Sequence, residues 1–344
     1  MYEIKVNFPL KKYNTFGIDV KTRYFSTCSS IDELIQSINI QKKENLPLMI
    51  LGGGSNVLFT ENFTGIIIQP ALKGVEVVNE NSRAVQLKVG AGEDWDEFVE
   101  YCVEKGWGGI ENLSLIPGNV GTSPIQNIGA YGMEVKDVIT EVETLEIDTF
   151  KIHRFKNADC QFGYRDSIFK RTLKGKHIIT HVFFRLNKKP EFILDYGNLK
   201  NELSTYGEIN LQNIRKAVID IRNAKLPNPE ETGNAGSFFK NPVIGFNAFE
   251  QLKKSYPEIP FFLLDNKLVK IPAGWLIEKA GWKGKRGGNV GVHQKQALVL
   301  INLGKATGKE VIQLAHKIQQ SVKDMFGIEL EMEVNVVHSS QFPV

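Results

Sequence analysis

Residues 51–56 read LGGGSN, and residues 116–132 read IPGNVGTSPIQNIGAYG. The first stretch ends a short apolar run, Leu46–Leu51, which we expect to form a strand. Its three consecutive glycines cannot continue that strand, and they let backbone N–H groups approach a phosphate closely. The stretch differs from the dinucleotide fingerprint G-x-G-x-x-G and lacks the Gly-Lys-Ser/Thr of a P-loop. A phosphate site and a tight turn are both open interpretations of this loop.

The second stretch combines four glycines with polar side chains. The hydroxyls of Thr122 and Ser123 and the amides of Gln126 and Asn127 can bind a pyrophosphate or the polar edge of a flat ring. Ile128 can pack on the apolar face of such a ring. A long loop inside a globular region is usually functional, although a structured surface loop is the alternative. Together the two loops favour a large nucleotide cofactor.

The composition is that of an ordinary globular protein. Of the 344 residues, 42% are hydrophobic and 24% are charged, which excludes a disordered chain and favours two or three domains. The formal net charge is only +3, and the basic clusters are short and lack interleaved aromatic residues. We interpret them as solvated surface and expect no nucleic-acid binding.

The three cysteines, Cys28, Cys102 and Cys160, lie far apart in the sequence. They predict neither a disulfide framework nor a paired-cysteine metal site, and a reducing compartment is the simplest interpretation. No two histidines have metal-ligand spacing, so we expect no metal. The N-terminus lacks the apolar stretch of a signal peptide, and no apolar run is long enough to span a membrane. We therefore expect a cytoplasmic protein.

Hydrophobic periodicity predicts a mixture of helices and strands. The predicted helices cover residues 31–42, 94–105, 211–223, 246–255, 273–280 and 310–326, and the predicted strands cover 46–51, 65–69, 85–89, 139–147, 178–186, 297–302 and 328–336. A capping box, Thr307–Glu310, opens the last helix. The segment Leu226–Pro229 contains two prolines and is the predicted domain boundary.

Two further segments contain candidate site residues. In FGYRDSIFK, residues 162–170, Arg165 can anchor a carboxylate bidentately, and a surface pair with Asp166 is an equal alternative. In GNAGSFFKNP, residues 233–242, the glycines before Ser237 allow a ligand to approach the backbone, but the segment also fits a capped turn. No histidine is near in sequence to act as a base, so the spacing alone does not make Ser237 catalytic.

The last predicted strand has a polar face that carries Glu329, Glu331 and Glu333, while apolar residues occupy the other face. By pattern the three glutamates are equivalent. The pattern alone therefore indicates that Glu333 is a solvated side chain.

Taken together, these segments closely resemble the UDP-N-acetylenolpyruvoylglucosamine reductase family, and the resemblance covers nearly the whole chain. Its landmarks are NTFGID (14–19), LGGGSNVLF (51–59), VGAGEDW (89–95), ENLSLIPGNVGTSPIQNIGAYG (111–132), FGYRDSIFK (162–170), KLPNP (225–229), GNAGSFFKNP (233–242), AGWLIEKAG (273–281) and LEMEV (330–334). The sequence LDYGNL (194–199) places Tyr196 where the longer subtype of the family has a tyrosine that covers the substrate.

The resemblance implies an α+β fold. An FAD-binding fold of the vanillyl-alcohol-oxidase type, made of two α+β subdomains, is joined by a separate α+β substrate-binding domain. We expect FAD-binding subdomain 1 at residues 1–70 and 329–344, FAD-binding subdomain 2 at 71–226, and the UDP-sugar domain at 227–328. The C-terminal strand is expected to return to subdomain 1, and the protein is expected to be a monomer.

The resemblance also implies that the two glycine-rich loops hold FAD. The expected cofactor-binding residues are Gly52, Gly53, Gly54, Ser55, Asn56, Thr122, Ser123, Gln126 and Ile128. Some flavoenzymes of this superfamily attach the flavin to a histidine or cysteine in these loops, and neither loop of this chain contains one. We therefore expect non-covalent FAD.

By the same resemblance, NADPH reduces FAD, and a hydride then passes from the flavin to the vinyl carbon of UDP-N-acetylglucosamine enolpyruvate, giving UDP-N-acetylmuramate. Arg165 and Glu333 match the family residues at the substrate carboxylate, and Ser237 matches the serine that protonates the carbanion. A serine hydroxyl keeps its proton at neutral pH but can give it to a much stronger carbon base. The residues expected at the UDP-sugar are Tyr131, Tyr164, Tyr196, Lys225, Asn241 and Gln296.

The chain departs from the family pattern at one place near the site. Where the family commonly has proline before the last glutamate, this chain has Met332, which we do not expect to move Glu333 off the polar face. Two other functions compete with the reductase. One is another flavoenzyme of the superfamily, such as a hydroxy-acid or lactone oxidase, and the other is a nucleotide-binding regulatory module without chemistry.

Overall fold

The computed structural model describes residues 3–264 and 266–339. These residues divide into two compact units. The first unit comprises Met1–Phe8, Thr22–Gly54 and Thr64–Ala224, and the second comprises Pro9–Lys21, Ser55–Phe63 and Lys225–Val344. The chain passes to the second unit for the last time after Ala224, next to the predicted boundary at Leu226–Pro229. The finer division into three domains stays a prediction.

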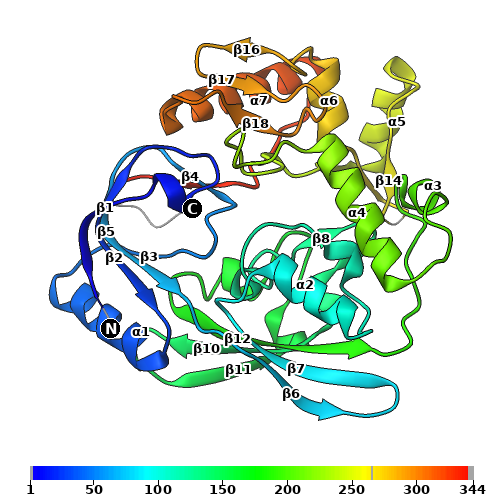
Figure 1. Cartoon of the computed structure of the whole chain (residues 1–344). Helices are drawn as coiled ribbons and strands as arrows, with labels where there is room; N and C mark the ends of the chain where they lie inside the picture. Colours follow the sequence, from blue (N-terminus) through cyan, green and yellow to red (C-terminus); the bar gives the residue numbers. More distant parts are fainter. Residues whose placement is uncertain (1–2, 265, 340–344) are drawn as a thin grey trace. The chain divides into compact units, whose positions relative to one another are not determined.

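A four-stranded sheet opens the first unit. Its strand order is β1 (Lys5–Pro9), β2 (Lys21–Cys28), β5 (Phe63–Pro70) and β3 (Leu48–Ile50). Strands β3 and β5 are parallel, with Leu48 opposite Ile66. Helix α1 (Ile31–Lys43) begins at Ser30, whose hydroxyl accepts a hydrogen bond from the Glu33 amide. Its buried residues pack against this sheet, beside which Figure 1 shows it in dark blue.

An antiparallel sheet of five strands forms the larger part of the first unit. Its order is β11 (Ile152–Lys156), β10 (Ile139–Glu146), β12 (His177–Asn187), β7 (Ala84–Gly90) and β6 (Val75–Glu80). Helix α2 (Trp95–Glu104) lies over one face of this sheet (Figure 1). The Asp94 carboxylate caps the helix by accepting hydrogen bonds from the amides of Asp96 and Glu97.

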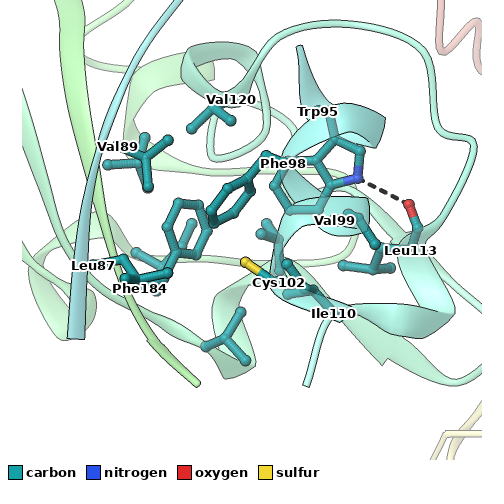
Figure 2. Packing of buried hydrophobic residues seen from close by; sticks show 14 of the residues in the cluster. Leu87, Val89, Trp95, Phe98, Val99, Cys102, Ile110, Leu113, Val120 and Phe184 are labelled. Atoms are coloured by element: carbon teal, nitrogen blue, oxygen red, sulfur yellow. Dashed lines mark hydrogen bonds between the residues drawn. The ribbon is translucent and has the colours of Figure 1, made fainter. Parts of the chain in front are cut away.

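Aromatic side chains fill the space between α2 and the sheet (Figure 2). The rings of Phe98 and Phe184 lie 5.0 Å apart between centroids, and Trp95 lies 6.1 Å from Phe184. The indole Nε1 of Trp95 donates a hydrogen bond of 2.8 Å to the carbonyl oxygen of Leu113 (Figure 2). The Trp95 amide donates to the carbonyl of Gly118 at 3.0 Å. This core therefore fixes the start of the second glycine-rich loop.

The end of that loop is a short hairpin of β8 (Gly129–Ala130) and β9 (Met133–Glu134). The two residues of its turn have positive φ, +48° at Tyr131 and +83° at Gly132, as a type I′ turn requires. Helices α3 (Leu199–Leu203) and α4 (Leu211–Lys225) complete the first unit. They share a small apolar cluster, and Tyr131 lies partly buried against it.

Among its described residues, the second unit contains two three-stranded sheets, three α-helices and one parallel strand pair. The sheets have the orders β13 (Val243–Gly245), β15 (Leu268–Lys270), β14 (Phe262–Leu263) and β16 (Arg286–Gly287), β17 (Val290–Val292), β18 (Leu300–Asn302). The helices are α5 (Phe246–Ser255), α6 (Ala273–Lys279) and α7 (Gly308–Phe326), and α7 contacts α6, β17 and β18 (Figure 1). Strand β4 (Val57–Phe59) pairs in parallel with β19 (Asn335–Val337).

The structure confirms all six predicted helices. The capping box at α7 is present, since the Thr307 hydroxyl accepts from the Glu310 amide and the Glu310 carboxylate accepts from the Thr307 amide. Helix α7 ends at Gly327, which has φ +67°. The three cysteines are free and buried.

The last strand is shorter than the predicted range of 328–336. Only Asn335–Val337 forms a strand, because the preceding residues pair with a different segment. The amide of Lys240 donates to the carbonyl of Glu331 at 2.9 Å, and the amide of Glu333 donates to the carbonyl of Phe238 at 2.8 Å. The predicted alternation holds from Ile328 to Glu331, with Leu330 buried and Glu331 exposed, whereas Met332 and Glu333 are both half-buried.

Candidate functional site

The two glycine-rich loops touch each other in the first unit. A Cβ atom added to Gly52 would lie 2.4 Å from Cγ2 of Thr122, and one added to Gly53 would lie 3.0 Å from Cα of Gly118. Real Cβ contacts are longer, so only glycine fits at Gly52 without movement. The structure therefore brings together the loops that were predicted separately as nucleotide-binding.

Several polar side chains of the second loop donate hydrogen bonds to backbone carbonyls within the same loop. The hydroxyls of Thr122 and Ser123 donate to the carbonyls of Asn119 and Val120, each at 2.8 Å. Ile128 belongs to the core between α2 and the sheet and is only 8% exposed. These contacts give the loop one conformation, and its backbone lies directly on Gly52 and Gly53.

Asn127 connects this loop to the segment that carries Arg165. Its amide Nδ2 donates to the carbonyl of Gly163 at 2.9 Å, and its Oδ1 accepts from the Lys136 amide at 3.1 Å. Asn127 itself has φ +45°. The side chain thus fixes the start of the FGYRDSIFK segment next to the loop.

Arg165 is held against the hairpin of the second loop. Its Nη2 donates to the carbonyl of Gly129 at 2.8 Å, and its own carbonyl accepts from Nζ of Lys170 at 3.2 Å. The residue adopts φ +54°, a left-handed conformation that is uncommon outside glycine. The carboxylate of Asp166 forms an ion pair with Arg171, on the same segment.

Tyrosines expected at the sugar nucleotide surround the same hairpin. Tyr131 occupies its turn, and its carbonyl accepts from Nδ2 of Asn112 at 2.9 Å. A Cβ on Gly132 would lie 3.4 Å from Cβ of Tyr196, so Tyr196 packs on this glycine and remains 40% exposed. Tyr164 is 37% exposed, and its ring centroid lies 5.7 Å from the Arg165 guanidinium. Arg165 and these three tyrosines therefore belong to one region of the first unit.

The sequence analysis missed one charged residue of this region, Arg222 on α4. Its Nε is shielded from solvent and has no hydrogen-bond partner among the described residues. Burial lowers the pKa of Arg222, and the groups whose charges act on it include Tyr131 and Arg165. Burial also raises the pKa of the Tyr131 hydroxyl, which the charge of Arg222 opposes. Helical spacing contained a signal, because Arg222 lies four residues after the buried Val218 and therefore on the same face of α4.

In the second unit, the segment with Ser237 lies between two others. Ser237 forms a bridge with Val299, and the Phe238 amide donates to the carbonyl of Leu298 at 2.8 Å. On the other side the Phe238 carbonyl accepts from the Glu333 amide at 2.8 Å. Phe238 is fully buried, so the segment is anchored by its aromatic side chain. The structure therefore places Ser237 and Glu333 on neighbouring segments.

Asn56, at the end of the first glycine-rich stretch, is hydrogen-bonded to the segment that carries Glu333. Nδ2 of Asn56 donates to the carbonyl of Glu333 at 3.2 Å. The carbonyl of Asn56 accepts from both the amide and Nδ2 of Asn335, at 3.1 Å and 3.0 Å. A predicted cofactor residue and a predicted catalytic residue are thus directly linked within the second unit.

Asn241 and Gln296, both expected at the UDP-sugar, meet at the start of α6. Oδ1 of Asn241 accepts from the Ala273 amide at 2.9 Å. A Cβ on Gly274 would lie 3.1 Å from Oε1 of Gln296. Lys225 is the exposed last residue of α4. Arg165 belongs to the first unit, whereas Ser237 and Glu333 belong to the second.

Known protein families match both the N-terminal and the C-terminal part of the chain. Residues 22–154 match a family model described as an FAD binding domain, and residues 228–337 match the UDP-N-acetylenolpyruvoylglucosamine reductase C-terminal domain. The reductase of Bacteroides fragilis is 48% identical over 330 residues, 96% of this chain and 99% of the relative. That of Flavobacterium johnsoniae is 47% identical over 338 residues, 97% of this chain and 100% of the relative. The chain belongs to the UDP-N-acetylenolpyruvoylglucosamine reductase family.

A solved member of this reductase family has the same fold. The enzyme from Thermus caldophilus gives a TM-score of 0.68 at 24% identity, with 98% of each chain covered. The predicted α+β fold class, with an FAD-binding fold of the vanillyl-alcohol-oxidase type, is confirmed. The predicted enzyme class, an FAD-dependent oxidoreductase, is confirmed as well.

The contact between the glycine loops fits FAD. Gly52 and Gly53 carry no side chains of their own, so a pyrophosphate can approach their backbone N–H groups closely. None of the helices in the described part of the chain has the length and apolar content needed to cross a membrane. Among residues 3–264 and 266–339, no group of three or more His, Cys, Asp or Glu side chains is arranged to hold a metal ion.

We predict that Gly52→Ala weakens FAD binding. The added Cβ would meet Cγ2 of Thr122 at 2.4 Å, and overpacking of this kind costs about 1–3 kcal/mol, or roughly 5- to 150-fold in affinity. The double variant Gly52→Ala/Thr122→Ser removes that methyl group but keeps the hydroxyl, so it should recover part of the affinity. Fluorescence titration of the apoprotein with FAD measures the effect.

The matched control is Gly245→Ala, because a Cβ at Gly245 meets no atom within 4 Å. It should bind FAD as the unaltered chain does. Equal FAD affinity in Gly52→Ala and Gly245→Ala would show that the contact between the loops does not shape the cofactor site.

Proposed function

We propose that this chain reduces UDP-N-acetylglucosamine enolpyruvate to UDP-N-acetylmuramate for peptidoglycan synthesis, with NADPH as the reductant and non-covalent FAD as the cofactor. Full-length relatives at up to 48% identity support this substrate. The observation that carries the proposal is the hydrogen bond from the Glu333 amide to the Phe238 carbonyl. It sets a glutamate and a serine with the expected chemistry on neighbouring segments.

Bound FAD supplies the acceptor and donor that couple oxidation of NADPH to reduction of the vinyl group. The net reaction adds a hydride to the terminal vinyl carbon and a proton to the carbon next to the carboxylate. Negative charge builds up on that second carbon and spreads into the carboxylate as an enolate. The protein must therefore stabilise an oxyanion and deliver one proton.

Arg165 and Glu333 are proposed to act on the carboxylate. The guanidinium of Arg165, oriented by the Gly129 carbonyl, can bind both carboxylate oxygens. Two adjacent carboxylates do not both ionise readily. Glu333 in its protonated form can instead share its proton with the enolate oxygen. Its placement depends on the Asn56 amide and the Phe238 carbonyl, which bind its backbone on either side.

Ser237 is proposed to give the proton to the carbon. Its hydroxyl holds the proton at neutral pH and releases it only to a strong base such as an enolate carbon. The bridge to Val299 and the buried Phe238 fix the backbone from which the hydroxyl projects. A fixed donor reduces the reorganisation that the proton transfer requires.

The remaining roles follow from position. We propose that the UDP-sugar is bound by Asn241 and Gln296 at α6, by Lys225 at the end of α4, and by Tyr131, Tyr164 and Tyr196 at the hairpin. The two glycine-rich loops, with Ser55, Asn56, Thr122, Ser123, Gln126 and Ile128, are proposed to bind FAD. We further propose a cytoplasmic monomer with three domains, of which the first includes the C-terminal strand.

Turnover tests the proposed function directly. The FAD-loaded protein should turn over NADPH catalytically only when UDP-N-acetylglucosamine enolpyruvate is present. Without it, one equivalent of NADPH should bleach the flavin, and adding that sugar nucleotide should restore the flavin absorption. Stopped-flow absorption spectroscopy follows both steps. Stoichiometric FAD without such turnover would refute the proposal, and rapid reoxidation by oxygen coupled to alcohol oxidation would favour an oxidase.

Ser237→Ala separates the two half-reactions. Reduction of the flavin by NADPH should remain unchanged, whereas oxidation by the enolpyruvyl substrate should slow by about 10²- to 10⁴-fold, the usual contribution of a positioned acid. Single-turnover kinetics measure each half, and the first half serves as the internal control. Unchanged oxidation by substrate would exclude Ser237 as the proton donor.

Glu333→Gln should also spare reduction by NADPH. Oxidation by the substrate should slow by roughly 10²-fold, because an amide replaces the carboxyl group at a developing oxyanion. The matched control is Glu331→Gln on the same segment, where the carboxylate is 70% exposed and pairs with Lys240. Equal damage to both half-reactions would assign Glu333 a structural role only.

A further inference from the structure

Asn112 is a polar side chain buried in the first unit. It belongs to the 3₁₀ helix η2 (Glu111–Leu113) and is only 2% exposed. Its Nδ2 donates two hydrogen bonds, to the carbonyl of Tyr131 at 2.9 Å and to the carbonyl of Ile193 at 2.8 Å. Its Oδ1 is buried and has no hydrogen-bond partner among the described residues. Turning the amide over would set that oxygen against two carbonyl oxygens, so the two acceptors determine its orientation.

The backbone next to Asn112 is fixed by the core of the first unit. The carbonyl of Leu113 accepts from the indole of Trp95 at 2.8 Å, and the Leu113 amide donates to the carbonyl of Ile110 at 2.9 Å. Asn112 therefore presents its two donors from a rigid base. A buried oxygen without a partner is unfavourable, and a leucine would fill a similar volume without that disadvantage. What the amide contributes at this position is its two donor bonds.

The two acceptors lie on different segments of the chain. Tyr131 is in the turn of the β8–β9 hairpin, whereas Ile193 lies three residues before Tyr196. Residues 190–195 belong to no helix or strand, and the Ile193 side chain is exposed. Neither a strand ladder nor side-chain burial therefore holds Ile193 in place. The hydrogen bond from Asn112 fixes its backbone.

Gly132 lets the same stretch come close to the hairpin. A Cβ at Gly132 would lie 3.0 Å from Cγ2 of Ile193 and 3.4 Å from Cβ of Tyr196. The neighbours of Ile193 in the sequence, Phe192 and Leu194, pack against the apolar cluster of α3 and α4. The stretch is thus docked on the hairpin, and the partly exposed Tyr196 remains accessible to a ligand.

We propose that Asn112 is a positioning residue of the reductase, which holds the stretch that carries Tyr196 docked on the β8–β9 hairpin so that the tyrosine is in place for the sugar nucleotide. This inference rests on the proposed function, because that function gives Tyr196 its ligand. Asn112 acts through its two hydrogen bonds to the backbone. A stretch that is docked beforehand loses little entropy on binding, whereas undocking lowers the apparent affinity in proportion to the docked fraction.

The experiment uses the FAD-loaded full chain and the variant Asn112→Leu, which keeps a side chain of similar volume but has no donor. Calorimetry measures the dissociation constant of UDP-N-acetylmuramate in Asn112→Leu, in Tyr196→Ala and in the variant with both changes. Hydrogen–deuterium exchange without the sugar nucleotide measures how firmly the amides of residues 191–197 are held.

The matched control is Asn157→Leu. Nδ2 of Asn157 also donates to two backbone carbonyls, those of Lys136 and Ile139, at 2.7 Å and 2.8 Å. Asn157 is half-buried in the same unit, and neither of its acceptors lies in the β8–β9 hairpin or in residues 190–195. The control therefore removes the same number and kind of hydrogen bonds without releasing Tyr196.

Asn112→Leu should weaken UDP-N-acetylmuramate binding by about 2- to 10-fold, the factor that corresponds to one net hydrogen bond. Exchange at residues 191–197 should become faster. In a chain that already carries Tyr196→Ala, the further change Asn112→Leu should leave the affinity as it is, because no tyrosine remains to be positioned. Asn112→Asp has the same shape but donates at most one hydrogen bond, so it should show a change of the same kind.

Asn112→Asp decides the matter if Asn112→Leu does not fold. Changes in affinity and exchange no larger than in Asn157→Leu would overturn the inference. Equal weakening with and without Tyr196 would also overturn it, because Asn112 would then act through Tyr131 or through the fold as a whole. So would an unchanged affinity in Tyr196→Ala. Failure of the unaltered protein to bind UDP-N-acetylmuramate would instead contradict the proposed function.

Discussion

The hydrogen bond from the Glu333 amide to the Phe238 carbonyl lies where three distant parts of the sequence meet. On one side of the Glu333 segment is Phe238, and on the other is Asn56, whose Nδ2 donates to the Glu333 carbonyl. Beyond Glu333 the chain becomes β19 and pairs with β4. The segment before β19 belongs to no strand, and these hydrogen bonds attach it to the rest of the second unit. The position of the glutamate side chain therefore depends on non-local backbone contacts.

The first unit uses a related constraint, close backbone approach. Gly52 lies so near Thr122 that a single added carbon would collide. The turn at Tyr131 and Gly132 has positive φ at both residues, and Arg165 also adopts a left-handed conformation. These positions fix the backbone at the proposed ligand site, where flexible side chains would lose more entropy on binding. Groups with expected roles are thus carried by loops of defined conformation.

The sequence predicted best what local rules determine. Helix α7 follows from its apolar periodicity and from the capping box between Thr307 and Glu310, both of which are local. The last strand was predicted too long because its residues change partner, from the Phe238 segment to β4, and a partner is not visible in alternation. Spacing alone likewise left Ser237 as a turn residue, and only the family resemblance gave it a role. A local sequence pattern does not indicate which residues from distant segments lie together in the fold.

Arg222 shows that a local pattern also does not indicate whether a charged residue has a counter-ion. A charged residue in an amphipathic helix is normally expected to face solvent. In α4 the repeated Ile-Arg pair is the sequence feature that argues against this expectation for its arginines. The structure distinguishes the two arginines by their partners, since Asp96 neutralises Arg215 and no described carboxylate neutralises Arg222. A buried charge without a counter-ion raises the free energy of the ligand-free fold.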